Sequence, residues 1–169
     1  IFCENSLEIP TNWGTDTQNS IQLGAFDVIL TNPPYGSKLK IDDRTILSHY
    51  DLGFQWKAKD GVYSKTTKQL DFQTPQVLFI ERCLNLLKPG GRLGIVAPES
   101  MFCNPSHKYI MNYVESKAQI EAVISMPENL FQPQITFHLK GTAGEKGTGL
   151  GLVLCKRFID LNDGEITVT

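Results

Sequence analysis

The run FDVILT at residues 26–31 ends at an Asn followed by two consecutive prolines, and no other feature restricts the fold as strongly. A continuous apolar and β-branched run is typical of a strand covered on both faces in a parallel sheet. Pro33 and Pro34 lack backbone N–H groups and have fixed φ angles, so the strand must end there. The sequence therefore predicts a buried central strand whose carboxyl end presents the side chains of Asn32 and Tyr35.

A helix and a second strand are predicted further along the chain. Residues 74–87 place apolar side chains at helical spacing, with Thr74 as a candidate N-cap and Pro75 at the first helical position. The segment KPGG ends this helix. RLGIVAP, at residues 92–98, then reads as a second buried strand.

A further helix and strand follow, and a long polar segment separates the first strand from the first helix. Residues 106–118 predict an amphipathic helix with Ser106 as a possible cap, and IEAVISMP at residues 120–127 predicts a third strand. Residues 36–71 are polar and are expected to form a long excursion. The alternation predicts an α/β, Rossmann-like fold of three layers with a mainly parallel sheet.

Composition limits the partners and the environment. Sixteen basic and 18 acidic residues give a net charge of -2, so nucleic acid would have to be contacted locally or with another subunit. The four cysteines are widely spaced and no Cys or His cluster has metal-ligand spacing, which favours a reduced cytoplasm and no metal site. No apolar run approaches the roughly 20 residues of a membrane helix, so no membrane contact is expected.

The group at Asn32 suits methylation of an exocyclic amine. The lone pair of the adenine N6 is conjugated into the ring and is a poor nucleophile. Two acceptors aimed at its hydrogens, the Asn32 side-chain oxygen and the Pro33 carbonyl, would localise that lone pair in the transition state. Pro34 keeps the corner rigid, and Tyr35 offers a face on which an extruded base can stack. An ordinary turn is the alternative interpretation, because Asn and Pro are common turn formers.

Two segments resemble a known family. FDVILTNPPYGSK looks like the catalytic strand and loop of the amino-group DNA methyltransferases, and KPGGRLGIVAPESMF with IEAVISMPENLFQP is similar to the modification subunit of type I restriction-modification systems. The resemblance covers residues 1–133, which we expect to form a methyltransferase catalytic domain. It implies adenine-N6 methylation of DNA, with the target adenine bound by these residues: Asn32, Pro33, Pro34 and Tyr35.

The resemblance also implies a cofactor and partners. S-adenosylmethionine is the cofactor of that family, and its binding residues would be Asn32 together with Asn5, Ser6 and Leu7, where the family usually has Asp-Ser-Leu. DNA is the expected substrate, and a DNA-specificity subunit and a restriction subunit are the expected partners. The family's glycine-rich cofactor loop would lie before Phe2. We therefore expect this chain alone to have little or no activity.

Residues 134–169 have a different character. GTGLGLVLCKRFIDLNDGEITVT resembles the last third of the ATP-binding domain of sensor histidine kinases, in which Gly147, Gly149 and Gly151 would contact nucleotide phosphates. A flexible surface loop is an alternative interpretation of this glycine-rich stretch. At the level of function, the alternatives to the methyltransferase are an ATP-binding module and a methyltransferase remnant without catalysis.

Basic and aromatic residues are interleaved in the long polar segment. Four lysines and a tryptophan could follow a phosphate backbone, as basic residues with stacking rings do, or could belong to a solvated loop. The residues are Lys38, Lys40, Lys57, Lys59 and Trp56.

Overall fold

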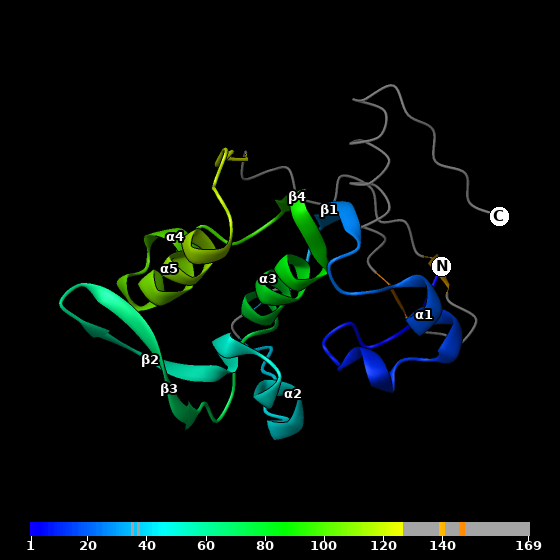
Figure 1. Cartoon of the computed structure of the whole chain (residues 1–169), viewed down its shortest axis with the longest axis horizontal. Coiled ribbons are helices and arrows are strands. Elements are labelled where there is room, and N and C mark those ends of the chain that lie inside the picture. The colour runs from blue at the N-terminus through cyan, green and yellow to red at the C-terminus, as the bar shows by residue number, and fades with distance from the viewer. Residues whose placement is uncertain (35, 37, 127–138, 141–145, 148–169) are drawn as a thin grey trace. The chain divides into compact units, whose positions relative to one another are not determined.

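The computed structural model describes residues 1–34, 36, 38–126, 139–140 and 146–147. The chain divides into two compact units, residues 1–121 and 122–169. All the elements from the first helix to α5 belong to the first unit (Figure 1). In the second unit, the short strands β5 (Leu139–Lys140) and β6 (Lys146–Gly147) pair in antiparallel orientation.

Two parallel strands form the sheet of the first unit. Strand β1 (Phe26–Thr31) pairs with β4 (Leu87–Ile95), and the register ends with Thr31 opposite Ile95. The sequence predicted two parallel strands with a helix between them in the chain, and this prediction is confirmed for β1 and β4. The prediction that the first strand is buried on both faces is wrong for the described residues, because Val28 and Leu30 are 56% and 60% exposed.

Helix α3 (Pro75–Leu86) connects the polar segment to β4 and is buried around most of its circumference. It begins as predicted, with Thr74 at the N-cap and Pro75 in the first turn. It contributes to two hydrophobic clusters of the first unit. The first contains Leu52, Val77, Ile80, Met101, Ile110 and Tyr113. The second contains Leu7, Ile46, Leu47, Tyr50 and Leu78.

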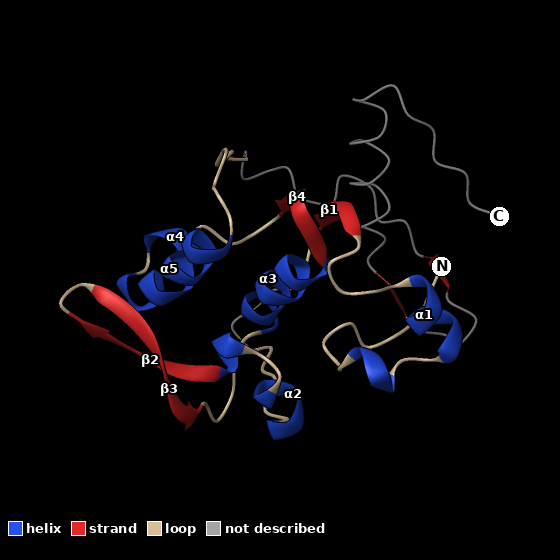
Figure 2. Cartoon of the chain, in the orientation of Figure 1, coloured by secondary structure: helices blue, strands red, loops and turns tan. Residues whose placement is uncertain are grey.

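The described residues of the polar segment form a short helix and a hairpin that is separate from the β1–β4 sheet. Helix α2 (Arg44–Ser48) is capped by Asp43, whose carboxylate accepts hydrogen bonds from two backbone N–H groups. Strands β2 (Phe54–Lys59) and β3 (Val62–Gln69) then form an antiparallel hairpin (Figure 2). Asp60 and Gly61 have φ angles of 52° and 81°, as the tight turn of a two-residue hairpin requires.

The remaining elements are short. At the N-terminal end lie the 3₁₀ turn η1 (Pro10–Asn12) and helix α1 (Thr15–Ser20), and η2 (Asp51–Gly53) precedes the hairpin. After β4 come α4 (Ser100–Cys103), η3 (Pro105–His107) and α5 (Lys108–Lys117). None of the described helices is long and apolar enough to cross a membrane.

Two local predictions need correction after β4. Ser106 is not the cap of the helix, because the N-cap of α5 is His107, which makes no side-chain cap hydrogen bond. Asn104 caps the preceding turn η3, where its Oδ1 accepts hydrogen bonds from the Ser106 N–H and hydroxyl. The third predicted strand is absent from residues 120–126. Val123 and Ile124 are 68% and 81% exposed there, so the apolar run has found neither a ladder partner nor a covering layer within the described residues.

Candidate active site

Asn32 follows the last ladder residue of β1. The Val96 N–H donates to the Thr31 carbonyl at 3.0 Å, so β1 stays paired up to its final residue. The ladder stops there because the next two residues after Asn32 are prolines and cannot donate. Pro33 is buried and Pro34 is exposed. The structure thus places Asn32 at the carboxyl end of a parallel strand, where ligands bind in open α/β sheets.

The side-chain oxygen of Asn32 has no hydrogen-bond partner among the described residues. Its Oδ1 is buried, with less than 1 Å² accessible, and so is the Gln76 Oε1 in the first turn of α3. An unpaired buried acceptor costs about 1–3 kcal/mol, and such groups are rare in folded proteins. An unpaired Oδ1 is what we expect of an acceptor whose hydrogen-bond donor belongs to a bound molecule. Because it is covered, a donor reaches it only after the covering atoms move.

The three residues expected to contact the cofactor have different surroundings. The Asn5 Oδ1 accepts a hydrogen bond from the Leu7 N–H at 3.2 Å, which closes a local turn. Leu7 is buried in a hydrophobic cluster, so its side chain supports the segment instead of facing a ligand. Ser6 lines a cavity.

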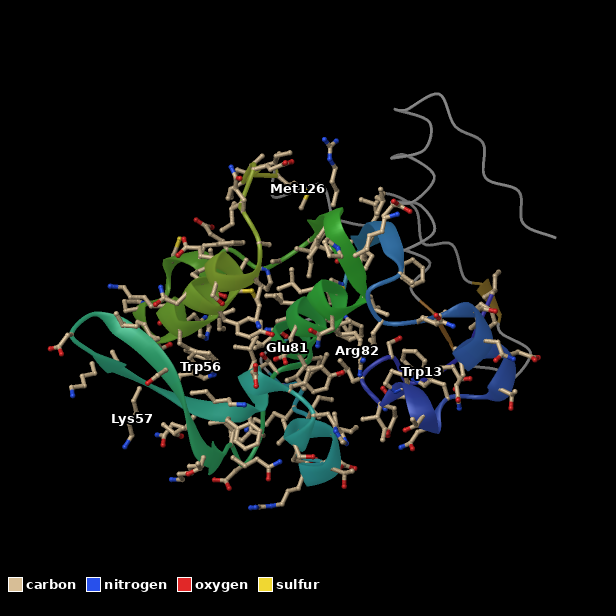
Figure 3. The ribbon with its side chains drawn as sticks, viewed as in Figure 1. Trp13, Trp56, Lys57, Glu81, Arg82 and Met126 are labelled. Carbon is tan, nitrogen blue, oxygen red and sulfur yellow. The ribbon has the colours of Figure 1, made fainter. Side chains whose placement is uncertain are left out.

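Tyr50 and Arg82 fix the backbone of this segment to the core. The Tyr50 hydroxyl donates to the Leu7 carbonyl at 2.8 Å, and the Arg82 guanidinium donates to the Glu8 carbonyl at 2.7 Å and to the Tyr50 hydroxyl at 2.9 Å. The guanidinium also lies 5.6 Å from the centre of the Trp13 ring. Figure 3 labels both residues. Burial raises the pKa of Tyr50 to about 12, so its hydroxyl keeps its proton.

Sequence reasoning missed both anchors. The available signal was a charged pair, Glu81 and Arg82, inside an apolar helix. Charged side chains are almost never fully buried unless they are paired. Here Glu81 is 3% exposed and Arg82 4% exposed. Their partners lie about 30 to 75 residues away along the chain and could not be identified from spacing.

Two hollows adjoin the N-terminal segment. One is a cavity of about 110 Å³ lined mainly by apolar side chains, and the other is an open depression of about 450 Å³. Both include Phe2, Glu4 and Thr17, and neither includes Asn32. The cavity is lined by Phe2, Glu4, Ser6, Trp13, Thr17, Ile21 and Leu86.

Comparison with known proteins places the site in a family. The family described as Eco57I restriction-modification methylase matches residues 4–131, which include the N-terminal segment, Asn32, α3 and β4. The chain belongs to the Eco57I restriction-modification methylase family. The general prediction of a restriction-modification methylase is confirmed, and the mixed α/β structure with a parallel strand pair is compatible with a methyltransferase fold.

A relative of this methylase occurs in Methanocaldococcus jannaschii, where it is named as a candidate type II restriction enzyme and methyltransferase. It is 27% identical over 122 residues, which are 72% of this chain and 9% of the relative. The chain therefore spans less than a tenth of the length of that protein. No solved structure matches the chain.

The described residues of the methylase fit only part of S-adenosylmethionine. Apolar walls and the Ser6 hydroxyl could receive a flat, mostly apolar group, but sites for ligands of this size usually measure about 300–1,000 Å³ and are enclosed. The cavity is too small and the depression is open. The Glu4 Oε1 is already used, because it accepts hydrogen bonds from the Gly14 N–H and the Thr17 hydroxyl.

Several predicted site residues lie outside the described part of the methylase. They are Tyr35 of the catalytic group and Gly149 and Gly151 of the alternative phosphate loop. Gly147 is described, and it ends strand β6, opposite Leu139. The phosphate-loop hypothesis therefore stays a prediction.

Proposed function

We propose that this methylase chain carries the target-base part of a DNA methyltransferase that acts on the N6 amine of adenine. The observation that carries the proposal is the buried, unpaired Asn32 Oδ1 at the carboxyl end of β1, within the segment that the family matches. The word methyltransferase in the name of the M. jannaschii relative also supports it.

The chemistry follows from the acceptors at the strand end. The Asn32 Oδ1 and the Pro33 carbonyl would each accept a hydrogen bond from one hydrogen of the amine. Those bonds strengthen as positive charge develops on the nitrogen, so they favour the transition state over the ground state. Because Oδ1 has already lost its water, it gives up no hydrogen bond when the amine arrives. Tyr35 would stack on the extruded base.

The donor and the partners belong to the same proposal. S-adenosylmethionine would supply the methyl group, with Ser6 on one wall of its site and Asn5 and Leu7 holding that wall in place. The resemblance to type I systems adds a DNA-specificity subunit and a restriction subunit, whereas the name of the relative points to a type II system. Co-purification of this chain with a separate specificity subunit would support the type I assignment.

The proposal can be tested without knowing the recognised DNA sequence. Two fluorescent single-stranded thymine oligonucleotides would carry one central residue, adenine in one and purine in the other. Purine lacks the exocyclic amine and is otherwise the same base. We expect tighter binding of the adenine oligonucleotide by about 3-fold to 10-fold, as one or two hydrogen bonds would give.

The variant Asn32→Ala keeps only the Pro33 carbonyl as an acceptor for the amine, so its preference for the adenine oligonucleotide should be clearly smaller than that of the wild type. Asn12→Ala, which changes an exposed amide of η1, is the matched control and should keep the preference. Equal binding of the two oligonucleotides by the wild-type chain would contradict the adenine assignment. A preference for cytosine over uracil, with none for adenine over purine, would reassign the amine to cytosine N4.

A further inference from the structure

The β2–β3 hairpin concentrates positive charge on a chain that is negative overall. Residues 54–69 contain four lysines and one aspartate, whereas the whole chain carries a net charge of -2. The aspartate, Asp60, lies in the turn. A local basic strip on an acidic chain is the pattern expected of a surface that binds a polyanion.

One face of the hairpin is fixed to the rest of the first unit. The Trp56 ring stacks on Tyr109 of α5 at 6.4 Å between ring centres and meets the edge of Tyr113 at 5.9 Å. Its indole N–H donates to the Asp51 carbonyl at 3.1 Å. Trp56 is therefore not available to stack on a nucleobase, which corrects one of the two interpretations of this segment. Lys65 on the same face forms an ion pair with Asp51.

The opposite face is open. Side chains alternate along a strand, so Lys57 and Lys59 point away from the face that holds Trp56. Figure 3 shows Lys57 extending away from the body of the first unit. Lys57 and Lys59 are exposed, and neither forms an ion pair with a described residue. Val62, opposite Lys59, is 68% exposed.

We propose that this outward face, Lys57, Lys59, Val62 and Ser64, contacts the phosphate backbone of duplex DNA. The inference rests on the proposed function. The two lysines are about 7 Å apart along the strand, and each DNA strand carries a phosphate every ~3.4 Å of axis, so they reach separate phosphates. A two-stranded ribbon also fits the major groove.

Salt dependence of binding tests the proposal. A fluorescent 24-base-pair duplex of random sequence would be titrated with wild type and with the double variant Lys57→Gln/Lys59→Gln, between 50 and 200 mM salt. Each lost phosphate contact reduces the slope of log affinity against log salt by about 0.9. For the double variant we expect the magnitude of the slope of log affinity against log salt to be smaller by about 2. We also expect it to bind at least 10-fold more weakly at 100 mM salt.

A matched control separates a local contact from the loss of charge. Arg92→Gln/Lys108→Gln removes the same two charges, from β4 and α5, and should lower affinity much less and leave the slope almost unchanged. Thermal melting of the wild type and both variants should coincide, because the four side chains are exposed and none forms an ion pair with a described residue. If the control changes the slope as much as the hairpin variant, the hairpin is not the contact.

The remaining outcomes distinguish this inference from the function itself. If the wild type binds DNA and the hairpin variant keeps the full slope, the inference is wrong while the methyltransferase proposal stands on the adenine preference. If duplex RNA binds as tightly as duplex DNA, the assignment of the ligand to DNA is wrong. No binding of any nucleic acid by the wild type would contradict both proposals.

Discussion

Asn32 and Gln76 each bury a carbonyl oxygen that accepts no hydrogen bond from the residues that the structure describes. A fold selected for stability alone would pair or expose such atoms, since each unpaired acceptor costs about 1–3 kcal/mol. At Asn32 the cost has a functional explanation, because an acceptor already bonded to the protein could not receive the amine of a base. Nothing in the structure explains the unpaired Gln76 Oε1.

The cost at Asn32 predicts an unusual separation of stability from function. Asn32→Ala removes the unpaired acceptor, so the free energy of unfolding should stay within about 1 kcal/mol of the wild type or rise, while the adenine preference decreases. Leu52→Ala, at a fully buried core position, should cost about 2–5 kcal/mol. Denaturation followed by tryptophan fluorescence measures both. A loss at Asn32 as large as that at Leu52 would mean that the amide is structural.

The position of Asn32 could be predicted from the sequence, whereas its lack of a partner could not. Two prolines end a strand by covalent geometry, so the residue before them must lie at the strand end. Whether a side-chain oxygen is paired depends on which distant residues pack around it. The surroundings of Asn5, Ser6 and Leu7 were unpredictable for the same reason, since they depend on Tyr50 and on Arg82.

Among the elements, α3 connects the N-terminal segment to the turn before the hairpin through two adjacent charged residues, Glu81 and Arg82. The Glu81 carboxylate accepts hydrogen bonds from the Asp51 and Leu52 N–H groups, both at 2.8 Å, and burial raises its pKa. Arg82 donates to the N-terminal segment. The helix therefore holds the base of the hairpin on one side and the expected cofactor segment on the other.

This arrangement predicts a local effect of replacing Arg82. Arg82→Met would leave the Glu8 carbonyl without its donor and the Leu7 carbonyl with the Tyr50 hydroxyl alone, so residues 1–17 should open more often and exchange backbone hydrogens at least 10-fold faster. Hydrogen exchange read by mass spectrometry resolves this segment from α5. Arg92→Met on β4 is the control, because that side chain is exposed. Equal acceleration in both segments would indicate global destabilisation and contradict a local anchoring role.

Elements with a local signal were predicted and those that depend on distant partners were not. The start of α3 follows from Thr74 and Pro75, which act within one turn. The hairpin also has a local signal that was overlooked, because Asp-Gly between alternating side chains favours a two-residue turn. This signal was missed because the lysines make both strands polar, and polar segments are usually interpreted as loops. Residues 120–126 show the reverse case, an apolar run that forms no strand because no described segment pairs with it.

At the scale of the whole molecule, stability should depend on alkaline pH through buried groups that must stay protonated. Burial raises the pKa of Cys83 to about 11 from its usual 9, and burial likewise raises that of Tyr50. The thiol ionises near pH 9 in the unfolded chain but only near pH 11 in the folded chain. Its contribution to stability is therefore complete below pH 9 and is lost as the pH rises through 11. The free energy of unfolding should therefore decrease between pH 9 and 11.

Replacing the thiol tests its share of that decrease. Cys83→Val keeps an apolar side chain of similar size and cannot ionise. Between pH 9 and 11 the free energy of unfolding of this variant should therefore fall less than that of the wild type. The difference should be about 2–3 kcal/mol, as a rise in pKa from 9 to about 11 gives. Trp13 and Trp56 both lie in the first unit, so their fluorescence follows the unit that contains Cys83. Cys103→Val, at an exposed thiol, should retain the wild-type pH dependence. If Cys83→Val also retained it, the thiol would have to ionise as readily in the folded chain as in the unfolded one, and its burial could not contribute to the alkaline instability.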